Sequence, residues 1–264
     1  MSGGTTSATT TTSSIAANTV SGVVSAGAIL TGTVYLKDSS NPVKEVSKAI
    51  NSDGSFSFDA TGLAKPFLLK AVARANASNA NDYVLYSFAN DAGTANINPM
   101  SHLVVTDAYY ASGGTDDPAT LYYSLSTTTV RPNDLSPLQP LADKLAAATT
   151  DVQVKLFDLL KVYGISTVNP ISDPFKADHM GLDGMLDDVI VDISNGSVTI
   201  TNKITNAVIF TAQANNISNG TITTINIPSK PSGASTASSA PRQRQGQLPG
   251  DRPDQLQDAL CRDL

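Results

Sequence analysis

The amino-acid sequence predicts an α+β fold, in which an antiparallel β-sandwich is followed by a small helical unit that an antiparallel β-meander closes. In the first third of the 264-residue chain, short apolar runs of period two alternate with turn residues. After Asn98 the apolar period changes to about 3.6 residues. The acidic residues are 22 Asp and a single Glu, Glu45. Because Asp favours turns and caps whereas Glu is a good helix former, this imbalance indicates strands, tight turns and short capped helices.

Short apolar stretches at the spacing of sandwich strands fill the chain between Thr19 and Asn98. We expect strands at Val23–Val24, Val34–Leu36, Val46–Ile50, Phe56–Phe58, Phe67–Val72 and Tyr83–Phe88. Between them, residues 38–42 read DSSNP and residues 51–54 read NSDG. The Asx side chains and the glycine of these segments are typical of turns that close antiparallel hairpins.

Four helices are expected between Asn98 and Gly164, and each has a capping residue or a proline near its start. They begin at Asn98–Pro99, Asp116–Pro118, Asn133–Asp134 and Asp151. The first runs to about Ala111, and Gly164 ends the fourth. The fourth helix has the clearest apolar stripe, which we expect to be buried. This stripe comprises Val154, Leu156, Phe157, Leu160 and Val162.

An antiparallel meander is expected to close the helical unit. Leu182, Met185 and Leu186 have the spacing of a helix of about two turns. Strands of period two follow at residues 189–193, 198–200 and 208–210. Between the first two of these strands, Asn195–Gly196 predicts a type I′ hairpin turn.

These elements divide the chain into four segments. We expect a flexible Ser/Thr tether at residues 1–18, a β-sandwich domain at 19–98, a helical and meander domain at 99–227, and a disordered tail at 228–264. Ten of the first 14 residues are Ser or Thr, too polar to offset the loss of chain entropy on folding. The tail contains four of the six Arg residues. The alternatives to a disordered tail are therefore a basic recognition tail and a segment that is foreign to the native chain. Its Cys261, the only cysteine, is expected to be exposed and unpaired.

The tether has the composition of what remains after a bacterial secretion or lipoprotein signal is removed. We therefore expect an extracellular or periplasmic protein, with a lipid anchor upstream of Met1 that would hold it at the outer membrane. A cytosolic protein with a flexible start is the alternative. No apolar run reaches the length of a transmembrane helix.

Two groups of residues in the predicted sandwich form a recognisable pattern: Gly32, Val34, Leu36 and Asp38, then Asp53, Gly54, Phe56 and Phe58. In this pattern the predicted sandwich resembles the carboxypeptidase-regulatory-like, or transthyretin-like, sandwich domains of bacterial exported proteins. Residues 96–110 and 175–212 resemble the helical entry and the C-terminal module of uncharacterised exported proteins, often lipoproteins, of Gram-negative bacteria. This resemblance covers about residues 19–215. It implies a transthyretin-like or immunoglobulin-like sandwich and brings no enzymatic activity with it.

Composition excludes several classes of function. One cysteine cannot form a disulfide framework, a zinc ribbon or an iron–sulfur site. A net charge of −6 argues against nucleic acid as a partner, because phosphate binding needs stripes of Lys and Arg. The only histidines, His102 and His179, are expected to be ordinary surface or core-edge residues, and Ser101 is too close in sequence to His102 to form a catalytic pair.

A carboxylate-rich stretch is the best chemical candidate for a site. Asp178, Asp183 and Asp187 could supply oxygens to calcium, although their spacing matches no calcium loop. The alternative is that they are solvated or capping carboxylates, with Asp183 and Asp187 facing solvent one helical turn apart. No other cofactor is expected.

Tyrosines are the second candidate, because carbohydrate recognition stacks sugar rings on exposed aromatic side chains and the chain has no Trp. Tyr83, Tyr86, Tyr109 and Tyr110 are the platforms considered. The alternative is that they fill the interface between the sandwich and the helices.

The sequence thus favours a non-enzymatic, exported structural or interaction module, with a protein or glycan at the cell surface as its partner. A carbohydrate-binding module that uses exposed tyrosines is the alternative. A hydrolase lacks support, because neither an activated nucleophile nor a metal-ligand set can be recognised.

Overall fold

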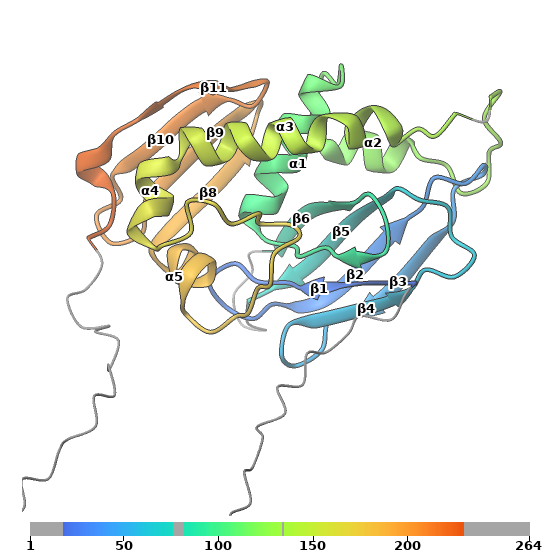
Figure 1. Cartoon of the computed structure of the whole chain (residues 1–264), viewed down its shortest axis with the longest axis horizontal. Coiled ribbons are helices and arrows are strands. Elements are labelled where there is room, and N and C mark those ends of the chain that lie inside the picture. Colours follow the sequence, from blue (N-terminus) through green and yellow to red (C-terminus); the bar gives the residue numbers. More distant parts are fainter. Residues whose placement is uncertain (1–17, 76–81, 134, 230–264) are drawn as a thin grey trace, which may run out of the picture. The chain divides into compact units, whose positions relative to one another are not determined.

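The computed structural model describes residues 18–75, 82–133 and 135–229, and these residues have the predicted α+β fold (Figure 1). The predicted tether, apart from Asn18, and nearly all of the predicted tail, with Cys261, lie outside the described residues. The boundary predicted at residue 98 falls at the N-cap of the first helix.

Seven strands form two sheets in the first part of the described chain. They are β1 (Thr19–Val23), β2 (Thr31–Lys37), β3 (Glu45–Ala49), β4 (Ser55–Asp59), β5 (Phe67–Arg74), β6 (Asp82–Ala89) and β7 (Gly93–Thr94). The small sheet has the order β4-β1-β7 and the large sheet the order β3-β2-β5-β6. All neighbours are antiparallel except β1 and β7. Five of the six predicted strands are confirmed, whereas the strand predicted at Val23–Val24 lies earlier, at Thr19–Val23. β7 was not predicted, because a strand of two residues shows no periodicity.

One apolar cluster takes alternate side chains from both sheets. Phe56 and Phe58 of β4 point into it, with their ring centroids 5.9 Å apart. The large sheet contributes side chains such as Leu69 and Leu85. This period-two burial is what the sequence pattern predicts for strands with one face in a core.

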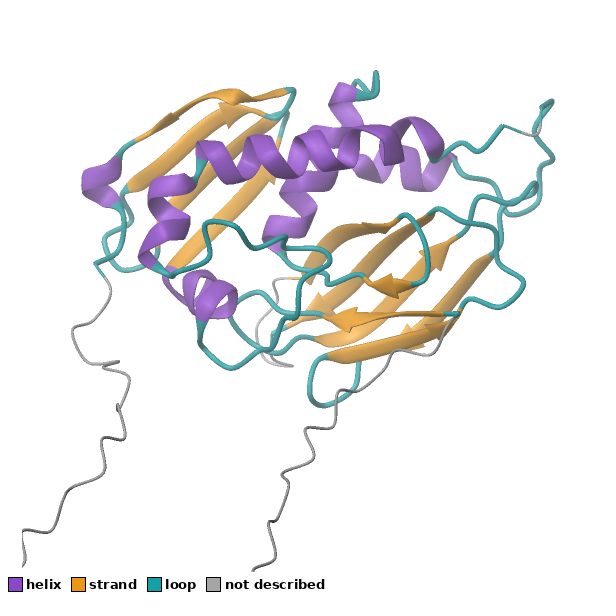
Figure 2. Ribbon diagram, in the orientation of Figure 1, coloured by secondary structure: helices purple, strands orange, loops and turns teal. Residues whose placement is uncertain are grey.

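The opposite face of the large sheet is also buried, because helices cover it (Figure 2). Leu68, Tyr86 and Phe88 pack there with residues of the first helix, such as Leu103 and Val104. Residues from both sides of the predicted boundary at 98 therefore share one apolar cluster. Burial on both faces explains why β5 is apolar throughout most of its length.

Gly32 and Asp38, two positions that carry the family resemblance, have structural roles. Gly32 has φ +154°, and a Cβ at this position would lie 2.2 Å from the carbonyl oxygen of Val72 on β5. The Asp38 carboxylate closes the turn between β2 and β3 by accepting backbone N–H groups of Ser40, Lys44 and Ala64.

Five α-helices follow among the described residues. They are α1 (Pro99–Ala111), α2 (Pro118–Ser124), α3 (Gln139–Lys155), α4 (Phe157–Val162) and α5 (Gly181–Asp188). The predicted caps of the first two are confirmed, because Asn98 accepts the N–H groups of Met100 and Ser101, and Asp117 accepts that of Ala119.

The prediction for the third and fourth helices is wrong in its boundaries. The third helix begins at Gln139 rather than near Asn133. Asp151 does not cap a helix but lies inside α3, which continues to Lys155. Val154 and Phe157 of the predicted buried stripe are 71% and 46% exposed, whereas Leu156 and Leu160 are buried as predicted. Val152 of α3 and Leu159 of α4 supply the other buried apolar side chains.

The meander is confirmed and has one more strand than predicted. Its strands are β8 (Val189–Ser194), β9 (Ser197–Asn202), β10 (Val208–Gln213) and β11 (Asn216–Ile222), followed by a 3-10 turn at Thr224–Asn226. Asn195 and Gly196 both have positive φ, as a type I′ turn requires. The polar strand β11 was missed, and its Gly220 leaves room for the ring of Phe210 on β10.

Candidate functional site

Two of the three predicted metal ligands lie together in the structure. One ligand atom from each of His179, Asp183 and Asp187 lies within 4.8 Å of the others. Asp178 is not a member of this group, and its carboxylate accepts the N–H of Met180 at 3.2 Å. The sequence-based hypothesis did not include His179, which approaches Asp183 because its backbone has φ +62° just before α5.

Asp183 is fully buried, so the expectation that it faces solvent is wrong. Its Oδ1 accepts a hydrogen bond from the Ser25 hydroxyl at 2.5 Å, and its Oδ2 accepts the N–H of His179 at 2.8 Å. Burial is tolerated because both oxygens are hydrogen-bonded. The carboxylate therefore joins the segment after β1 to the start of α5.

The other members of this cluster are also bonded within the chain. His179 Nδ1 lies 2.8 Å from Asp187 Oδ2, and this carboxylate raises the pKa of the exposed imidazole. The nearby Lys203 ammonium donates to the carbonyl of Leu186 at 2.6 Å. Calcium takes six to eight oxygens, whereas this group offers two carboxylates and a nitrogen. The cluster thus fits calcium poorly, and a metal site here stays a hypothesis.

The four predicted platform tyrosines do not form one surface. Tyr86 is 1% exposed and packs in the helix-covered cluster, whereas Tyr83 is half-buried against the opposite face of the large sheet. Tyr109 and Tyr110 are half-buried neighbours at the end of α1, with ring centroids 6.3 Å apart. Of the four, only Tyr86 is too buried to stack on a ligand.

Tyr110 lines a polar pocket of about 360 Å³. The pocket lies between the α1–α2 connection and the β8–β9 hairpin, and it is lined by Thr106, Tyr110, Thr115, Asp116, Asp117, Ile193, Ser194, Asn195, Gly196 and Ala214. Partial burial, reinforced by the two carboxylates, raises the pKa of the Tyr110 hydroxyl, which therefore stays protonated. Hydroxyls, an amide and carboxylates beside an aromatic ring are the groups that bind polyols.

His102 is not placed for catalysis. Burial lowers the pKa of its imidazole to about 4. Its Nε2 and the hydroxyl of the adjacent Tyr86 have no hydrogen-bond partner in the described structure. The Ser101 hydroxyl donates to the Asn98 carbonyl at 2.8 Å as part of the helix cap. Ser101 and His102 thus have separate structural roles.

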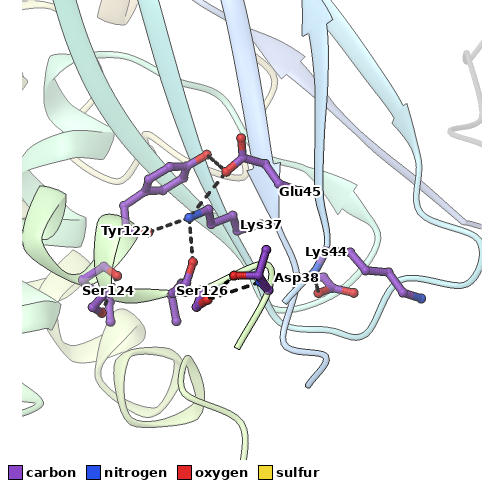
Figure 3. Close-up of polar contacts among 10 residues, drawn as sticks. Lys37, Asp38, Lys44, Glu45, Tyr122, Ser124 and Ser126 are labelled. Carbon is purple, nitrogen blue, oxygen red and sulfur yellow. Dashed lines mark hydrogen bonds and ion pairs between the residues drawn. The ribbon is translucent and has the colours of Figure 1, made fainter. Parts of the chain in front are cut away.

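A cluster around Lys37, which sequence reasoning missed, joins α2 to the large sheet (Figure 3). The buried Lys37 ammonium donates to the carbonyls of Tyr122 and Leu125 at 2.9 and 2.8 Å, and it lies 3.4 Å from Glu45 Oε2. The Tyr122 hydroxyl donates to the same carboxylate oxygen at 3.2 Å. Burial lowers the pKa of Lys37, and Glu45 opposes this shift.

Lys70 lies beside this cluster, directly opposite Tyr35 in the pairing of β2 with β5. Its ammonium lies over the rings of Tyr35, Tyr122 and Tyr123, at 4.7, 4.2 and 4.8 Å from their centroids. One feature of the sequence could have indicated this cluster. Lys70 lies within the apolar run FLLKAVA, and a lysine is unusual in a strand that is buried on both faces.

An open groove of about 660 Å³ lies over the outer face of the small sheet. Small side chains form its floor: Ser21, Gly22, Ser55, Ser57 and Thr94. Its wall is the segment between α4 and α5, which includes Val168, Phe175 and Met180.

Two asparagines hold this wall in place. Asn96 donates its side-chain amide to the Asp173 carbonyl at 2.8 Å, and Asn98 donates to the Pro170 carbonyl at 2.9 Å. Both asparagines are buried, so the wall is tied to the core on the side of β7 and α1.

Comparisons of the chain with protein-family models, with curated proteins and with solved structures find no match. None of the helices in the described residues is long and apolar enough to cross a membrane.

Proposed function

We propose that this chain is a non-enzymatic interaction module of an exported protein, at the cell surface or in the periplasm, and that the groove along β1 and β4 contacts an extended segment of a partner protein. The groove carries this proposal, because its volume of about 660 Å³ is that of a ligand-binding cleft. The transthyretin-like resemblance and two sheets around one apolar cluster support a sandwich scaffold.

An extended partner segment suits the shape and chemistry of the groove. β4 is an edge strand, so one row of its backbone donors and acceptors has no strand partner in the small sheet. The floor offers hydroxyls, and Phe175 and Met180 offer apolar surface for alternate side chains of a bound strand.

Site-specific photocrosslinking tests this function. A photoreactive residue in place of the exposed Ser57, on the groove floor, should crosslink to a protein in envelope extracts. The same residue in place of the exposed Thr211, on β10, is the matched control and should not. Ser57→Arg should abolish capture and Thr211→Arg should preserve it. Equal capture by both arginine variants would exclude the groove as the binding site of the partner.

Carbohydrate binding is the second candidate, and the pocket beside Tyr110 favours it over the other predicted tyrosines. A glycan array separates the two functions. Tyr110→Ala should abolish any glycan signal, whereas Tyr83→Ala, on the opposite side of the large sheet, should preserve it. A glycan signal that both variants retain would exclude this pocket as the glycan-binding site.

A further inference from the structure

Lys70 has a largely buried side chain, and no carboxylate pairs with its ammonium within the described part of the chain. The residue is only 7% exposed. Its polar head contacts the faces of three tyrosine rings, and no described oxygen accepts a hydrogen bond from it. Cation–π contacts leave the hydrogen-bond donors of the ammonium without an acceptor in the described structure. A ligand with an anionic group could therefore form a charge-assisted hydrogen bond at this position.

The local charge balance supports an anionic ligand. The Lys70 ammonium is close enough to lower the pKa of Lys37, and Glu45 is the carboxylate that pairs with Lys37. Lys37 already directs its ammonium at Glu45 and at the carbonyls of Tyr122 and Leu125. The surplus positive charge thus resides on Lys70, in a protein whose net charge is −6.

An exposed aromatic face lies next to this charge. Tyr123 is 67% exposed although its ring lies over the Lys70 ammonium, and Tyr35 is half-buried on the other side. The exposed Ser47 hydroxyl group belongs to the residue directly opposite Tyr35 on β3. A sugar ring stacks on an aromatic face of this kind, and its carboxylate pairs with the neighbouring cation.

We propose that Lys70, Tyr35 and Tyr123 form a subsite for an acidic sugar residue, with the sugar ring on Tyr123 and its carboxylate at the Lys70 ammonium. The subsite shares no lining residue with the groove or with the Tyr110 pocket. It goes beyond the proposed function, which can hold or fail without it.

Titration calorimetry with two oligosaccharides of equal length tests the subsite. Trigalacturonate carries the carboxylates that the proposal requires, and trigalactose lacks them. Wild-type protein should bind trigalacturonate, with an affinity that falls as salt is raised, and should bind trigalactose at least tenfold more weakly. Inorganic phosphate is the third probe, and it should not compete at equal concentration.

Three variants complete the design. Lys70→Met keeps the length of the side chain and should weaken trigalacturonate binding at least tenfold. Tyr123→Ala changes an exposed side chain, so the fold is retained, and should also weaken binding at least tenfold. Lys48→Met removes an exposed lysine of β3 as the matched control and should have no effect.

Three outcomes would overturn the proposal. The first is no binding of trigalacturonate by the wild-type protein. The second is unchanged affinity in Tyr123→Ala, which tests the site even if Lys70→Met does not fold. The third is phosphate competition at equal concentration, which would identify a general anion site without sugar recognition.

Discussion

The Ser25 hydroxyl donates a 2.5 Å hydrogen bond to the buried carboxylate of Asp183, which lies 158 positions later in the chain. Ser25 belongs to the β1–β2 connection and Asp183 to α5. The same connection places Gly27 against the carbonyl of Leu186, where a Cβ would lie only 2.4 Å from the oxygen. This contact joins the strands of the first part of the chain to the helix that precedes the meander.

Ser25→Ala should lower the free energy of unfolding by about 1–3 kcal/mol, because it leaves one oxygen of a buried carboxylate without a donor. Urea denaturation followed by circular dichroism measures the change. Ser57→Ala, which removes an exposed hydroxyl, is the control and should change stability by less than about 0.5 kcal/mol. Equal stability of the two variants would show that the Ser25 contact contributes nothing.

Asp107 on α1 is 8% exposed, and burial together with the Asp151 carboxylate raises its pKa to about 6. The unfolded chain has a pKa near 4 at this residue, so the folded state holds the proton more tightly. The contribution of Asp107 to the free energy of unfolding is therefore fully present below about pH 4, and it is lost as pH rises through 6. Asp107→Asn should stabilise the protein by about 3 kcal/mol at pH 7.5 and by nothing at pH 4.

Urea denaturation at both pH values measures this difference. Asn keeps an acceptor for the N–H of Ile217, which Asp107 contacts in the wild type. Asp192→Asn, at an exposed position of β8, is the control and should leave the pH profile unchanged. Parallel profiles for wild type and Asp107→Asn would contradict the raised pKa.

The elements were predictable where local chemistry determines them. Asn98 and Asp117 act as helix caps because their side chains reach N–H groups two or three residues ahead. Asn195–Gly196 forms its hairpin turn because both residues tolerate positive φ. By contrast, β11 has too few apolar residues for a periodic signal, and it becomes a strand by pairing with β10.

The candidate sites were less predictable, because they depend on which distant segments meet. Asp183 and Asp187 are one turn apart on a helix, yet Asp183 is buried because Ser25 approaches from the first part of the chain. Lys70 and Tyr123 come from β5 and α2, and no spacing in the sequence relates them. The single Glu was visible from the start, whereas its pairing with Lys37 required the register of β2 and β3.

The pKa of His179 should be higher, and that of His102 lower, than the ordinary histidine value of about 6.5. Hydrogen bonding and charge from Asp187 raise the pKa of His179, whereas burial lowers that of His102 to about 4. Proton NMR of the two imidazole C2 signals measures both values. Asp187→Asn should lower only the pKa of His179, and the stability that its protonated form contributes is lost as pH rises through that value. Two coincident titration curves would contradict this assignment.

Calcium addition and chelation should leave the melting temperature unchanged, because both oxygens of Asp183 already accept hydrogen bonds from Ser25 and His179. Differential scanning calorimetry with millimolar calcium or EDTA measures the effect. An increase in melting temperature with calcium that Asp183→Asn abolishes would instead establish a metal site at this cluster.

Glu45 should not be replaceable by Asp, although Asp is the acidic residue that the chain uses everywhere else. The shorter side chain would not reach both Lys37 and the Tyr122 hydroxyl, so Lys37 would keep a buried charge with only two carbonyl acceptors. Glu45→Asp and Glu45→Gln should each lower the free energy of unfolding by about 1–3 kcal/mol. Lys48→Met, which removes an exposed lysine on the same edge strand outside this cluster, should change it by less than about 0.5 kcal/mol. A Glu45→Asp variant as stable as the wild type in urea would show that the ion pair is dispensable for holding α2 on the sheet.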